Sequence, residues 1–138
     1  HKFYESSVRV PLFIRYPARF SPKTVSENVN LCDLYATLCD LCHIEIPEHL
    51  DSCSLTDLMA GNSSNWDNES ISQYLGQYLM IKRNQLKYHY YGPDMPEVLW
   101  DLEQYPGETI NLISDPSYTG VLKQFRNRRD QLGFSPEK

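Results

Sequence analysis

Long hydrophobic runs and an excess of positive charge are both absent from this sequence of 138 residues. No stretch approaches the ~18 consecutive apolar residues of a transmembrane helix. Lys and Arg number 13 against 18 Asp and Glu, and the formal net charge is −5. Because binding to nucleic acid requires a basic surface, the charge balance argues against a nucleic-acid partner. The hydropathy argues against a membrane partner.

A signal segment is also absent, since no charged and then apolar stretch opens the chain. The chain starts at His1 rather than at Met, inside what reads as structured sequence, so we interpret it as a truncated or processed piece. Hydrophobic residues make up 41% and aromatic residues 12%, which is enough for the modest core of one domain. Two N-glycosylation sequons, at Asn62 and Asn68, are short enough to arise by chance, so the cellular compartment stays open.

Cysteine occurs only within residues 32–53, and part of that stretch has a haem-like pattern. Cys39, Cys42 and His43 match the C-x-x-C-H motif of c-type haem attachment. A zinc site formed by these three residues with Cys53 has suitable ligand types but only one C-x-x-C half. Buried structural thiols are the favoured interpretation, because an unpaired Cys behaves as a small hydrophobic residue.

The residues around this motif predict an amphipathic helix from about Leu31 to His43, with Asn30 as its N-cap. A leucine ridge marks one side of this helix and polar residues share the opposite side. At least one of Cys39 and Cys42 should then point into the core, where a haem thioether cannot form, and we therefore expect no haem. The ridge consists of Leu31, Leu34, Leu38 and Leu41, and the polar side consists of Asp33, Thr37 and Asp40.

The pattern of apolar and polar residues in the first half of the chain is typical of part of a larger α/β domain. Residues Val8 to Tyr16 alternate and then become solidly apolar, which predicts a strand covered on both faces. A surface connection follows over residues 16–30, and residues 46–61 read as a turn and a short helical segment that ends at Gly61. No partner strand or βαβ unit appears nearby, so we expect the sheet that this strand joins to lie outside the chain.

The second half has short, Tyr-rich runs broken by turn residues, which indicate antiparallel strands and hairpins. Residues 120–133 form an amphipathic pattern that closes at Gly133 and predict a final helix. We therefore expect an α+β fold, with a small antiparallel sheet packed against a C-terminal helix and preceded by a strand and helix of a larger α/β domain. The predicted division is residues 1–61 for the end of the larger domain and 62–138 for the C-terminal subdomain.

Three stretches together resemble one family, the type I sulfatases of the alkaline-phosphatase-like superfamily. Residues 1–20, HKFYESSVRVPLFIRYPARF, resemble a segment that often reads W-x-K-H-x-F-Y-E-G-S-V-R-V-P-L-I-I-R-x-P. Residues 29–55 resemble V-S-L-V-D-L-x-P-T-L-L-D-L-A-G-I-x-x-P-x-x-L-D-G-x-S-L, with Ala36 at the usual Pro and Ser52 at the usual Gly. MIKRNQLKYHYY with EVLWDLEQYPGETINLISDP resembles the terminal M-I-R-x-G-x-x-K-Y and L-Y-D-L-x-x-D-P-x-E-x-x-N-L blocks. SQYLGQ beside YLMIKRNQLKY resembles the choline-sulfatase branch.

This resemblance implies the C-terminal portion of an enzyme that hydrolyses sulfate esters. Sulfatases use a formylglycine, made from the Cys or Ser of a C/S-x-P-S-R motif, together with Ca²⁺ or another divalent cation. That motif and the Asp-Asp metal pair are absent here, and the sulfate-binding Lys of the W-x-K motif should come one position before His1. We therefore expect no catalytic residue and no metal ligand in this chain, and no activity from this chain alone. An N-terminal sulfatase domain is the implied partner.

The residues expected to lie nearest the absent catalytic groups are at the start of the chain. His1 could face the sulfate pocket or be an ordinary exposed residue. Lys2 is a tempting sulfate ligand, although it matches a variable family position and a solvated side chain is favoured. Glu5 and Arg9 match family positions and are interpreted as structural, through an ion pair or as hydrogen-bonding anchors.

Tyrosines of the second half supply a further candidate surface. Tyr74 and Tyr78, with His89 and Tyr91, could form a rim for substrate or a contact in a homo-oligomer. Tyr-rich strands are also common as simple half-buried sheet. Two alternatives to the sulfatase reading stay open at this point: a phosphoryl-ester hydrolase of the same superfamily, and a non-catalytic binding module that retains the fold.

Overall fold

The computed structural model describes residues 3–135, and these form two compact units. We call the first the sheet unit; it comprises the described residues of His1–Val10 and Glu69–Lys138. The second, the helical unit, comprises Pro11–Asn68. The boundary between these units is not at Gly61, where the sequence predicted it. Residues 62–68 belong to the helical unit, and the start of the chain belongs to the sheet unit. The assignment of residues 1–61 to a larger domain stays a prediction.

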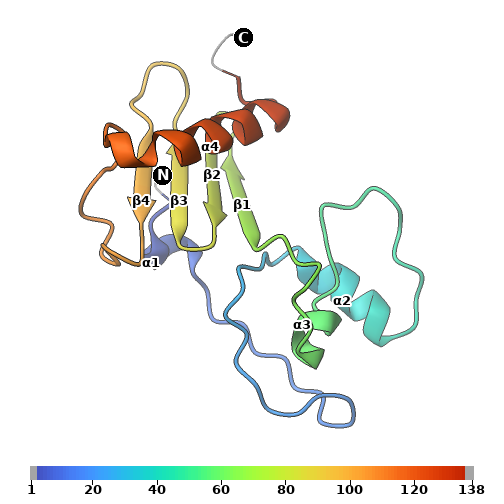
Figure 1. Cartoon of the computed structure of the whole chain (residues 1–138). Helices are drawn as coiled ribbons and strands as arrows, with labels where there is room; N and C mark the ends of the chain where they lie inside the picture. The colour runs from blue at the N-terminus through green and yellow to red at the C-terminus, as the bar shows by residue number, and fades with distance from the viewer. Residues whose placement is uncertain (1–2, 136–138) are drawn as a thin grey trace. The chain divides into compact units, whose positions relative to one another are not determined.

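The sheet unit contains a four-stranded antiparallel sheet in the order β1-β2-β3-β4 (Figure 1). Consecutive strands pair, so each connection is a local hairpin or loop. The tight turn between β2 and β3 leaves only two residues between the paired ends, and its first residue, Asn84, has a φ of 52°. Asn tolerates that left-handed conformation better than most residues, which is why the chain reverses there. The strands are β1 Glu69–Tyr74, β2 Tyr78–Arg83, β3 Leu86–Tyr90 and β4 Val98–Asp101.

One face of this sheet is covered by α4, Thr119–Gln131, which follows a short 3₁₀ helix, η1, Pro116–Tyr118. The ring of Phe125 stacks on Tyr88 at a centroid distance of 5.6 Å and an interplanar angle of 14°. The predicted α+β fold of a small antiparallel sheet with a C-terminal helix is confirmed. The core between helix and sheet consists of Leu79, Ile81, Tyr88, Tyr90, Leu99, Leu112, Leu122 and Phe125.

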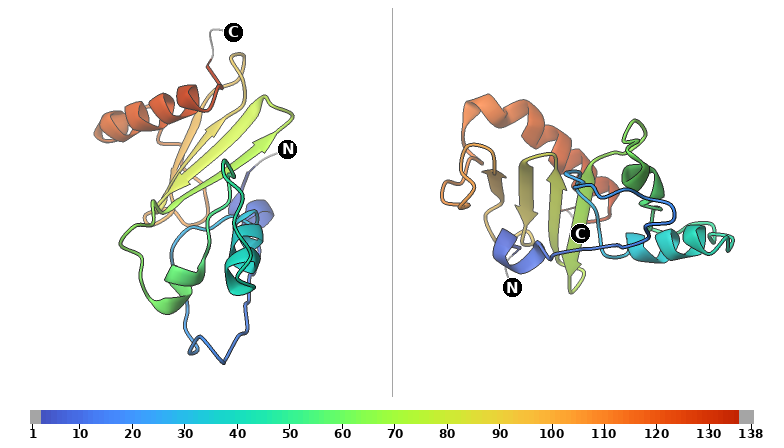
Figure 2. Two further views of the ribbon diagram at one scale, coloured as in Figure 1. Left: turned by 90° about the vertical axis from the view of Figure 1, so that its right-hand side faces the viewer. Right: turned by 90° about the horizontal axis from the view of Figure 1, so that it is seen from below.

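The opposite face of the sheet carries the start of the chain, and we call it the α1 face. The helix α1, Glu5–Val8, and α4 lie on opposite sides of the strands in both views of Figure 2. Because successive side chains of a strand alternate between faces, Tyr88 points toward α4 while Lys87 and His89 point toward α1. Phe3 is buried on this face.

The strand predicted for residues 8–16 is wrong for the described structure. Residues 5–8 form α1 instead, and residues 9–16 form no regular strand. A strand is stable only when its backbone groups pair with a neighbour, and the strands of the described chain pair only within the sheet unit. The apolar side chains that prompted the prediction are left uncovered in part, since the side chain of Phe13 is 92% exposed.

The helical unit contains α2, Asp33–Leu41, and α3, Thr56–Ala60. α3 ends at Gly61, whose φ of 97° is the left-handed conformation that favours glycine at a helix C-terminus. Among residues 3–135, no helix has both the length and the apolar character needed to cross a bilayer.

The orientation predicted for α2 is wrong, because its polar side is buried and much of its leucine ridge is exposed. Asp33 and Thr37 are 2% and 1% exposed, whereas Leu31 and Leu38 are 57% and 60% exposed. Polar residues occupy the inside because they bind the backbone of the segment that leads into α3. The Asp33 carboxylate accepts hydrogen bonds from the backbone N–H groups of Asn30 at 2.7 Å and Cys53 at 3.0 Å.

Four more hydrogen bonds, made by Thr37 and Asp40, complete this inner surface of α2. The Thr37 hydroxyl donates to the Asp33 carbonyl at 2.6 Å and accepts from the backbone N–H of Leu55 at 2.9 Å. Asp40 accepts from the hydroxyls of Ser54, at 2.6 Å, and Thr56. α2 therefore serves as a hydrogen-bonding scaffold for residues 51–56, and its apolar ridge is left on the outside.

Candidate functional site

A buried cluster of charges fixes the start of the chain to the α1 face. Lys87 is fully buried, and its ammonium contacts Glu5 at 2.9 Å and Glu108 at 2.8 Å. Lys82 adds a third contact, to the second oxygen of Glu5, at 3.3 Å. The backbone N–H of Glu5 donates to Glu108 at 2.7 Å. Since each buried charge faces an opposite one, the cluster satisfies the main condition for placing ions inside a protein.

Electrostatics within this cluster favour the ionised form of Glu5. Burial alone raises the pKa of its carboxyl, because a charge is less stable away from water. The hydrogen bond and positive charge of Lys87, with the contribution of Lys82, outweigh that effect and hold the pKa below its usual value. Glu5 is thus an ionised anchor and unsuited to act as a general acid near neutral pH.

A buried histidine, His89, lies next to the charge cluster. We call His89 and the rings around it, Phe3, Tyr91 and Trp100, the aromatic cage. His89 is 1% exposed, and its Nδ1 shares a hydrogen bond of 3.0 Å with the Tyr91 hydroxyl. Phe3 and Trp100 present edge-to-face contacts, with ring centroids 5.8 and 6.3 Å from that of His89. Burial lowers the pKa of His89 to about 3, and the positive charge of Lys87 contributes to the shift. The imidazole is therefore neutral at physiological pH.

Two nitrogens of this cage are buried without a hydrogen-bond partner among the described residues. They are Nε2 of His89 and Nε1 of Trp100. A buried polar group without a partner costs about 1–3 kcal/mol, so such groups are uncommon in stable folds. Their presence distinguishes this part of the α1 face from the apolar core on the α4 face.

A row of aromatic rings continues from the cage to the edge of the sheet. The rings of Tyr74 and Tyr78 stack with centroids 6.2 Å apart, and Tyr78 meets Tyr91 edge to face at 5.7 Å. Tyr91 in turn stacks with Phe3 at 6.2 Å. The tyrosines are half-buried, so each presents part of a ring to solvent. We call the set Phe3, Tyr74, Tyr78 and Tyr91 the aromatic row.

The structure brings only some of the predicted site residues into this region. Tyr74 and Tyr78 belong to the aromatic row, and Glu5 belongs to the charge cluster. Arg9 is exposed, and no ion pair of its side chain occurs among residues 3–135. His1 and Lys2 lie outside the described residues.

Sequence reasoning missed several members of the site. Lys87 reads as an ordinary solvent-facing strand residue, and Glu108 lies in a loop, where its φ is 51°. The available signal was the alternation of β3, which places Lys87 and His89 on the face opposite the apolar side chains. Trp100 follows the same rule on β4, where its neighbour Leu99 belongs to the core beneath α4.

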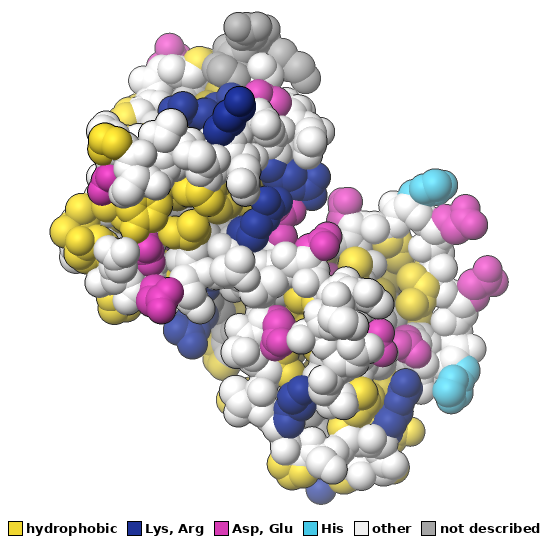
Figure 3. Space-filling model, in the orientation of Figure 1, with side chains coloured by type: hydrophobic (Ala, Val, Ile, Leu, Met, Phe, Trp, Pro, Cys, Tyr) yellow, Lys and Arg dark blue, Asp and Glu magenta, His cyan; other side chains and the backbone are white. Residues whose placement is uncertain are grey.

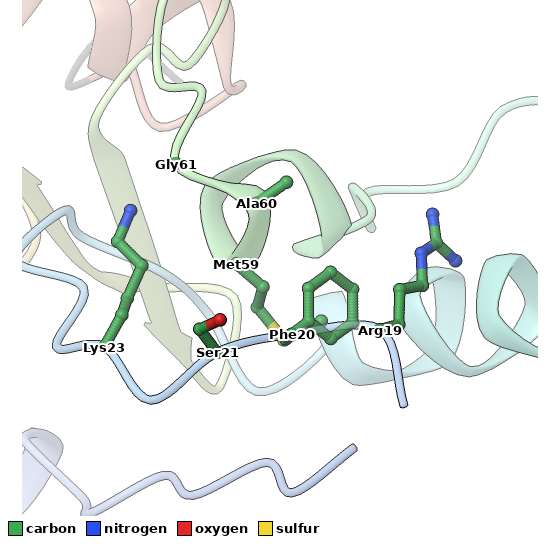
Figure 4. Close-up of a pocket in the computed structure, with 7 residues that line it drawn as sticks. All are labelled: Arg19, Phe20, Ser21, Lys23, Met59, Ala60 and Gly61. Atoms are coloured by element: carbon green, nitrogen blue, oxygen red, sulfur yellow. The ribbon is translucent and has the colours of Figure 1, made fainter. Parts of the chain in front are cut away.

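The helical unit has an open hollow of about 440 Å³ at the end of α3 (Figure 4). The guanidinium of Arg19 lies 5.2 Å from the centroid of the Phe20 ring, and the Lys23 ammonium donates to the Leu58 carbonyl at 3.1 Å. Both cations are therefore already engaged within the unit. The lining residues are Arg19, Phe20, Ser21, Lys23, Met59, Ala60 and Gly61.

The haem-like and zinc-like patterns do not form a site in the structure. Cys39 is buried, as predicted for at least one cysteine of the pair, while Cys32, Cys42 and Cys53 are exposed. All four are free thiols. Within residues 3–135, no three or more His, Cys, Asp or Glu side chains gather in a way that could hold a metal ion. The zinc alternative therefore has no support from the geometry.

Comparisons with known proteins match this chain to sulfatases. It is 32% identical over 132 residues to an arylsulfatase of Clostridium perfringens, covering 89% of this chain and 27% of that protein. It is 27% identical over 135 residues to a Delta 4,5-hexuronate-2-O-sulfatase of Bacteroides thetaiotaomicron, covering 90% and 28%. A solved 2-O GAG sulfatase has 29% identity and a TM-score of 0.61, covering 72% of this chain and 23% of that one.

The chain thus spans about a quarter of the length of the curated relatives it matches. Its match to a protein family is far more complete, since residues 1–133 fit the family described as N-sulphoglucosamine sulphohydrolase, C-terminal. That range includes the whole sheet and α4 as well as both helices of the helical unit. The chain therefore belongs to the N-sulphoglucosamine sulphohydrolase C-terminal family.

Proposed function

We propose that the intact protein is a sulfatase that hydrolyses sulfate esters, and that this chain is its C-terminal part. The observation that carries the proposal is the family match over residues 1–133, together with relatives that are themselves sulfatases. Because the chain spans about a quarter of those relatives, an N-terminal sulfatase domain is the partner that completes the enzyme.

The reactive groups are assigned to that N-terminal domain. A formylglycine as nucleophile and a divalent cation such as Ca²⁺ are what the sulfatase resemblance implies. The sequence of this chain has no C/S-x-P-S-R motif, and the described residues offer no cluster for a metal. We therefore assign no bond-making step to the residues of this chain.

The contribution of this chain is proposed to be positional. The charge cluster holds Glu5, and the aromatic cage holds Phe3, so both ends of a three-residue segment are fixed to a rigid sheet. A residue just before this segment is then restricted in where it can reach. His1 and Lys2 are proposed to lie next to the sulfate pocket on that account, and the W-x-K lysine is proposed to precede them.

The aromatic row is proposed to form part of the substrate rim. Half-buried tyrosine rings suit the apolar face of a sugar, and the hexuronate sulfatase relative makes a sulfated sugar the broad substrate class. The resemblance to the choline-sulfatase branch gives a narrower candidate, choline sulfate, whose quaternary ammonium also binds aromatic faces. The two substrates differ enough for a direct competition to separate them.

The test is a substrate panel on the intact protein. Aryl sulfate, a hexuronate 2-sulfate, choline sulfate and aryl phosphate are compared by kcat/KM. We expect a sulfate ester to be the preferred substrate. Preference for the phosphate would favour the phosphoryl-ester hydrolase alternative, and absence of turnover with every ester would favour the non-catalytic binding module.

The rim assignment has its own test in the same enzyme. Tyr78→Ala should raise KM for the preferred sulfate ester by about tenfold while kcat changes little, because the ring is proposed to bind substrate away from the reacting bond. Tyr16→Ala, at an exposed tyrosine of the helical unit, is the matched control and should leave both constants unchanged. An unchanged KM in Tyr78→Ala, with the fold intact by circular dichroism, would remove the aromatic row from the substrate site.

A further inference from the structure

The loop that follows α3 contains an exposed N-glycosylation sequon, Asn62-Ser63-Ser64. The backbone N–H of Asn62 donates to the Asp57 carbonyl at 2.9 Å, so the sequon begins at the closed C-terminal turn of α3. Every residue of the sequon is exposed. A match this short is weak evidence by itself, because sequons also arise by chance. Exposure and hydrogen bonding distinguish a usable acceptor from a chance match.

The hydroxyl group of this sequon contacts the amide that would accept a glycan. Ser64 Oγ donates to Asn62 Oδ1 at 2.7 Å, and the backbone N–H of Ser64 donates to the same oxygen at 3.2 Å. Among residues 3–135, the amide nitrogen Nδ2 of Asn62 donates to no acceptor. The atom that would carry the glycan is therefore unengaged, while the carbonyl oxygen of the same amide is held by two donors.

The second sequon, Asn68-Glu69-Ser70, is part of the packed fold. Asn68 Oδ1 accepts a hydrogen bond from the backbone N–H of Asn28 at 2.6 Å, and the Asn68 carbonyl accepts from Asn28 Nδ2 at 3.0 Å. Asn68 is only partly exposed, and its φ is 52°. Glu69 and Ser70 belong to β1 and pair with β2. A bulky group on the Asn68 amide would disturb these contacts.

We propose that Asn62 is an N-glycosylation site and that Asn68 is not, in a protein made in a secretory compartment. The co-substrate is an oligosaccharide linked to a lipid diphosphate. Asn62 Nδ2 forms a bond to C1 of the first sugar, and the bond between C1 and the diphosphate oxygen breaks. The amide loses one proton, and the lipid diphosphate leaves with the electron pair of the broken bond. No oxidant or reductant is needed.

Ser64 favours this reaction at the amide of Asn62. An amide nitrogen is a weak nucleophile, because its lone pair is delocalised into the carbonyl group. Loss of a proton from Nδ2 increases the negative charge on Oδ1. The N–H and O–H donors of Ser64 point at that oxygen and stabilise the charge as it develops.

The surface around Asn62 can accommodate a glycan. Gly61 and Asn65, on either side of the sequon, are exposed, and so is Lys23 near Gly61. Figure 3 shows polar or charged side chains and backbone over much of the visible face of the helical unit. A glycan is bulky and hydrophilic, so a folded protein tolerates it where the chain is exposed to water. Asn62 meets this condition, whereas the contacts of Asn68 do not.

The experiment is glycopeptide mapping of the intact protein, produced in cultured animal cells from its own start. Peptide N-glycosidase F in heavy-oxygen water converts each occupied Asn into a labelled Asp, which mass spectrometry of the peptides identifies. We expect the glycan occupancy of Asn62 to exceed that of Asn68 at least about tenfold. An unoccupied Asn62, or an occupancy of Asn68 that equals or exceeds it, would overturn the proposal.

Variants of the sequon test the role of Ser64. Ser64→Ala keeps the acceptor amide but removes the hydroxyl, and the occupancy of Asn62 should fall at least about tenfold. Ser64→Thr restores a hydroxyl and should retain the glycan. Ser63→Ala, at the exposed middle position, is the matched control and should leave occupancy unchanged. Full occupancy in Ser64→Ala would contradict the assignment of Ser64.

The readout is independent of catalysis. Glycan occupancy is measured on peptides and does not depend on turnover of a sulfate ester. Failure of the glycosylation proposal and failure of the sulfatase proposal are therefore separate outcomes.

Discussion

At the scale of single residues, Lys87 determines how the start of the chain is held. Its ammonium is the only described cation that contacts both Glu5 and Glu108. A fully buried lysine is uncommon unless it is paired, and here two carboxylates pair with it. The cluster joins residues 82 positions apart in the sequence, so it is a long-range tertiary contact.

Lys87→Met tests the contribution of this charge cluster to stability. The substitution keeps a similar volume but leaves the buried carboxylate of Glu108 without its cation and the partly buried Glu5 with Lys82 alone, so we expect a loss of about 3 kcal/mol in the free energy of unfolding. Urea denaturation followed by circular dichroism measures it. Lys123→Met, on the exposed side of α4, should change stability by less than about 0.5 kcal/mol. A Lys87→Met protein as stable as wild type would contradict the assignment.

His89 gives the sheet unit a pH dependence of known sign. Its pKa is lowered to about 3 when folded, from an ordinary value of 6.5, so between these values the unfolded chain binds a proton that the folded chain does not. Stability is therefore full above pH 6.5 and is lost as the pH falls toward 3. Lys87 reinforces the shift, whereas the negative charge of Glu5 opposes it.

His89→Phe should flatten this dependence. Between pH 7 and 5 the wild type is expected to lose stability with a slope that approaches about 1.4 kcal/mol per pH unit, and the variant should lose little. Urea midpoints measured at several pH values provide the comparison. His43→Asn, at an exposed residue with a φ of 56°, should retain the wild-type slope. Equal slopes in wild type and His89→Phe would refute the role of His89.

At the scale of elements, the strands and helices differ in how well the sequence predicts them. The hairpins and α4 were predicted because aromatic runs, turn residues and helical spacing are local signals. α2 was predicted as a helix, but its buried side was predicted wrongly. Hydropathy indicates which side of a helix is apolar, but the buried side depends on what the neighbouring segment requires, and residues 52–56 require hydrogen-bond partners.

Thr37→Val measures the importance of the polar side of α2. Valine preserves the shape but leaves the buried backbone N–H of Leu55 without an acceptor, so we expect a loss of about 1–3 kcal/mol. Thermal unfolding of the protein gives the value. Thr24→Val, at an exposed position, is the matched control and should be nearly neutral. If the two variants unfolded together with wild type, the hydrogen bonds of Thr37 would not be stabilising α2.

At the scale of the whole molecule, the chain has an organised sheet unit, and its sequence contains no C/S-x-P-S-R motif. The charge cluster and the aromatic row lie on the α1 face of the sheet, and the described residues hold no metal-binding cluster. The exposed apolar residues Phe13 and Leu38 are explained if further protein covers them.

The isolated chain of 138 residues is therefore expected to be inactive. Without the C/S-x-P-S-R motif it has no precursor of a formylglycine, so purified chain should hydrolyse an aryl sulfate no faster than buffer does. A colorimetric assay with a sensitive aryl sulfate is sufficient, and the intact protein serves as the positive control. Turnover by the isolated chain that survives repurification would show that the chemistry does not require the preceding domain.

The sequence by itself determined the family, the hairpins and α4, because motifs, turn residues and side-chain periodicity are properties of neighbouring residues. Only the tertiary structure decided which charges are buried and which side of α2 faces inward. Lys87 is buried because Glu5 and Glu108 reach it from distant parts of the chain, and Thr37 is buried because Leu55 needs an acceptor. Burial depends on partners that local patterns do not identify, and for this reason the structure reversed the prediction for α2.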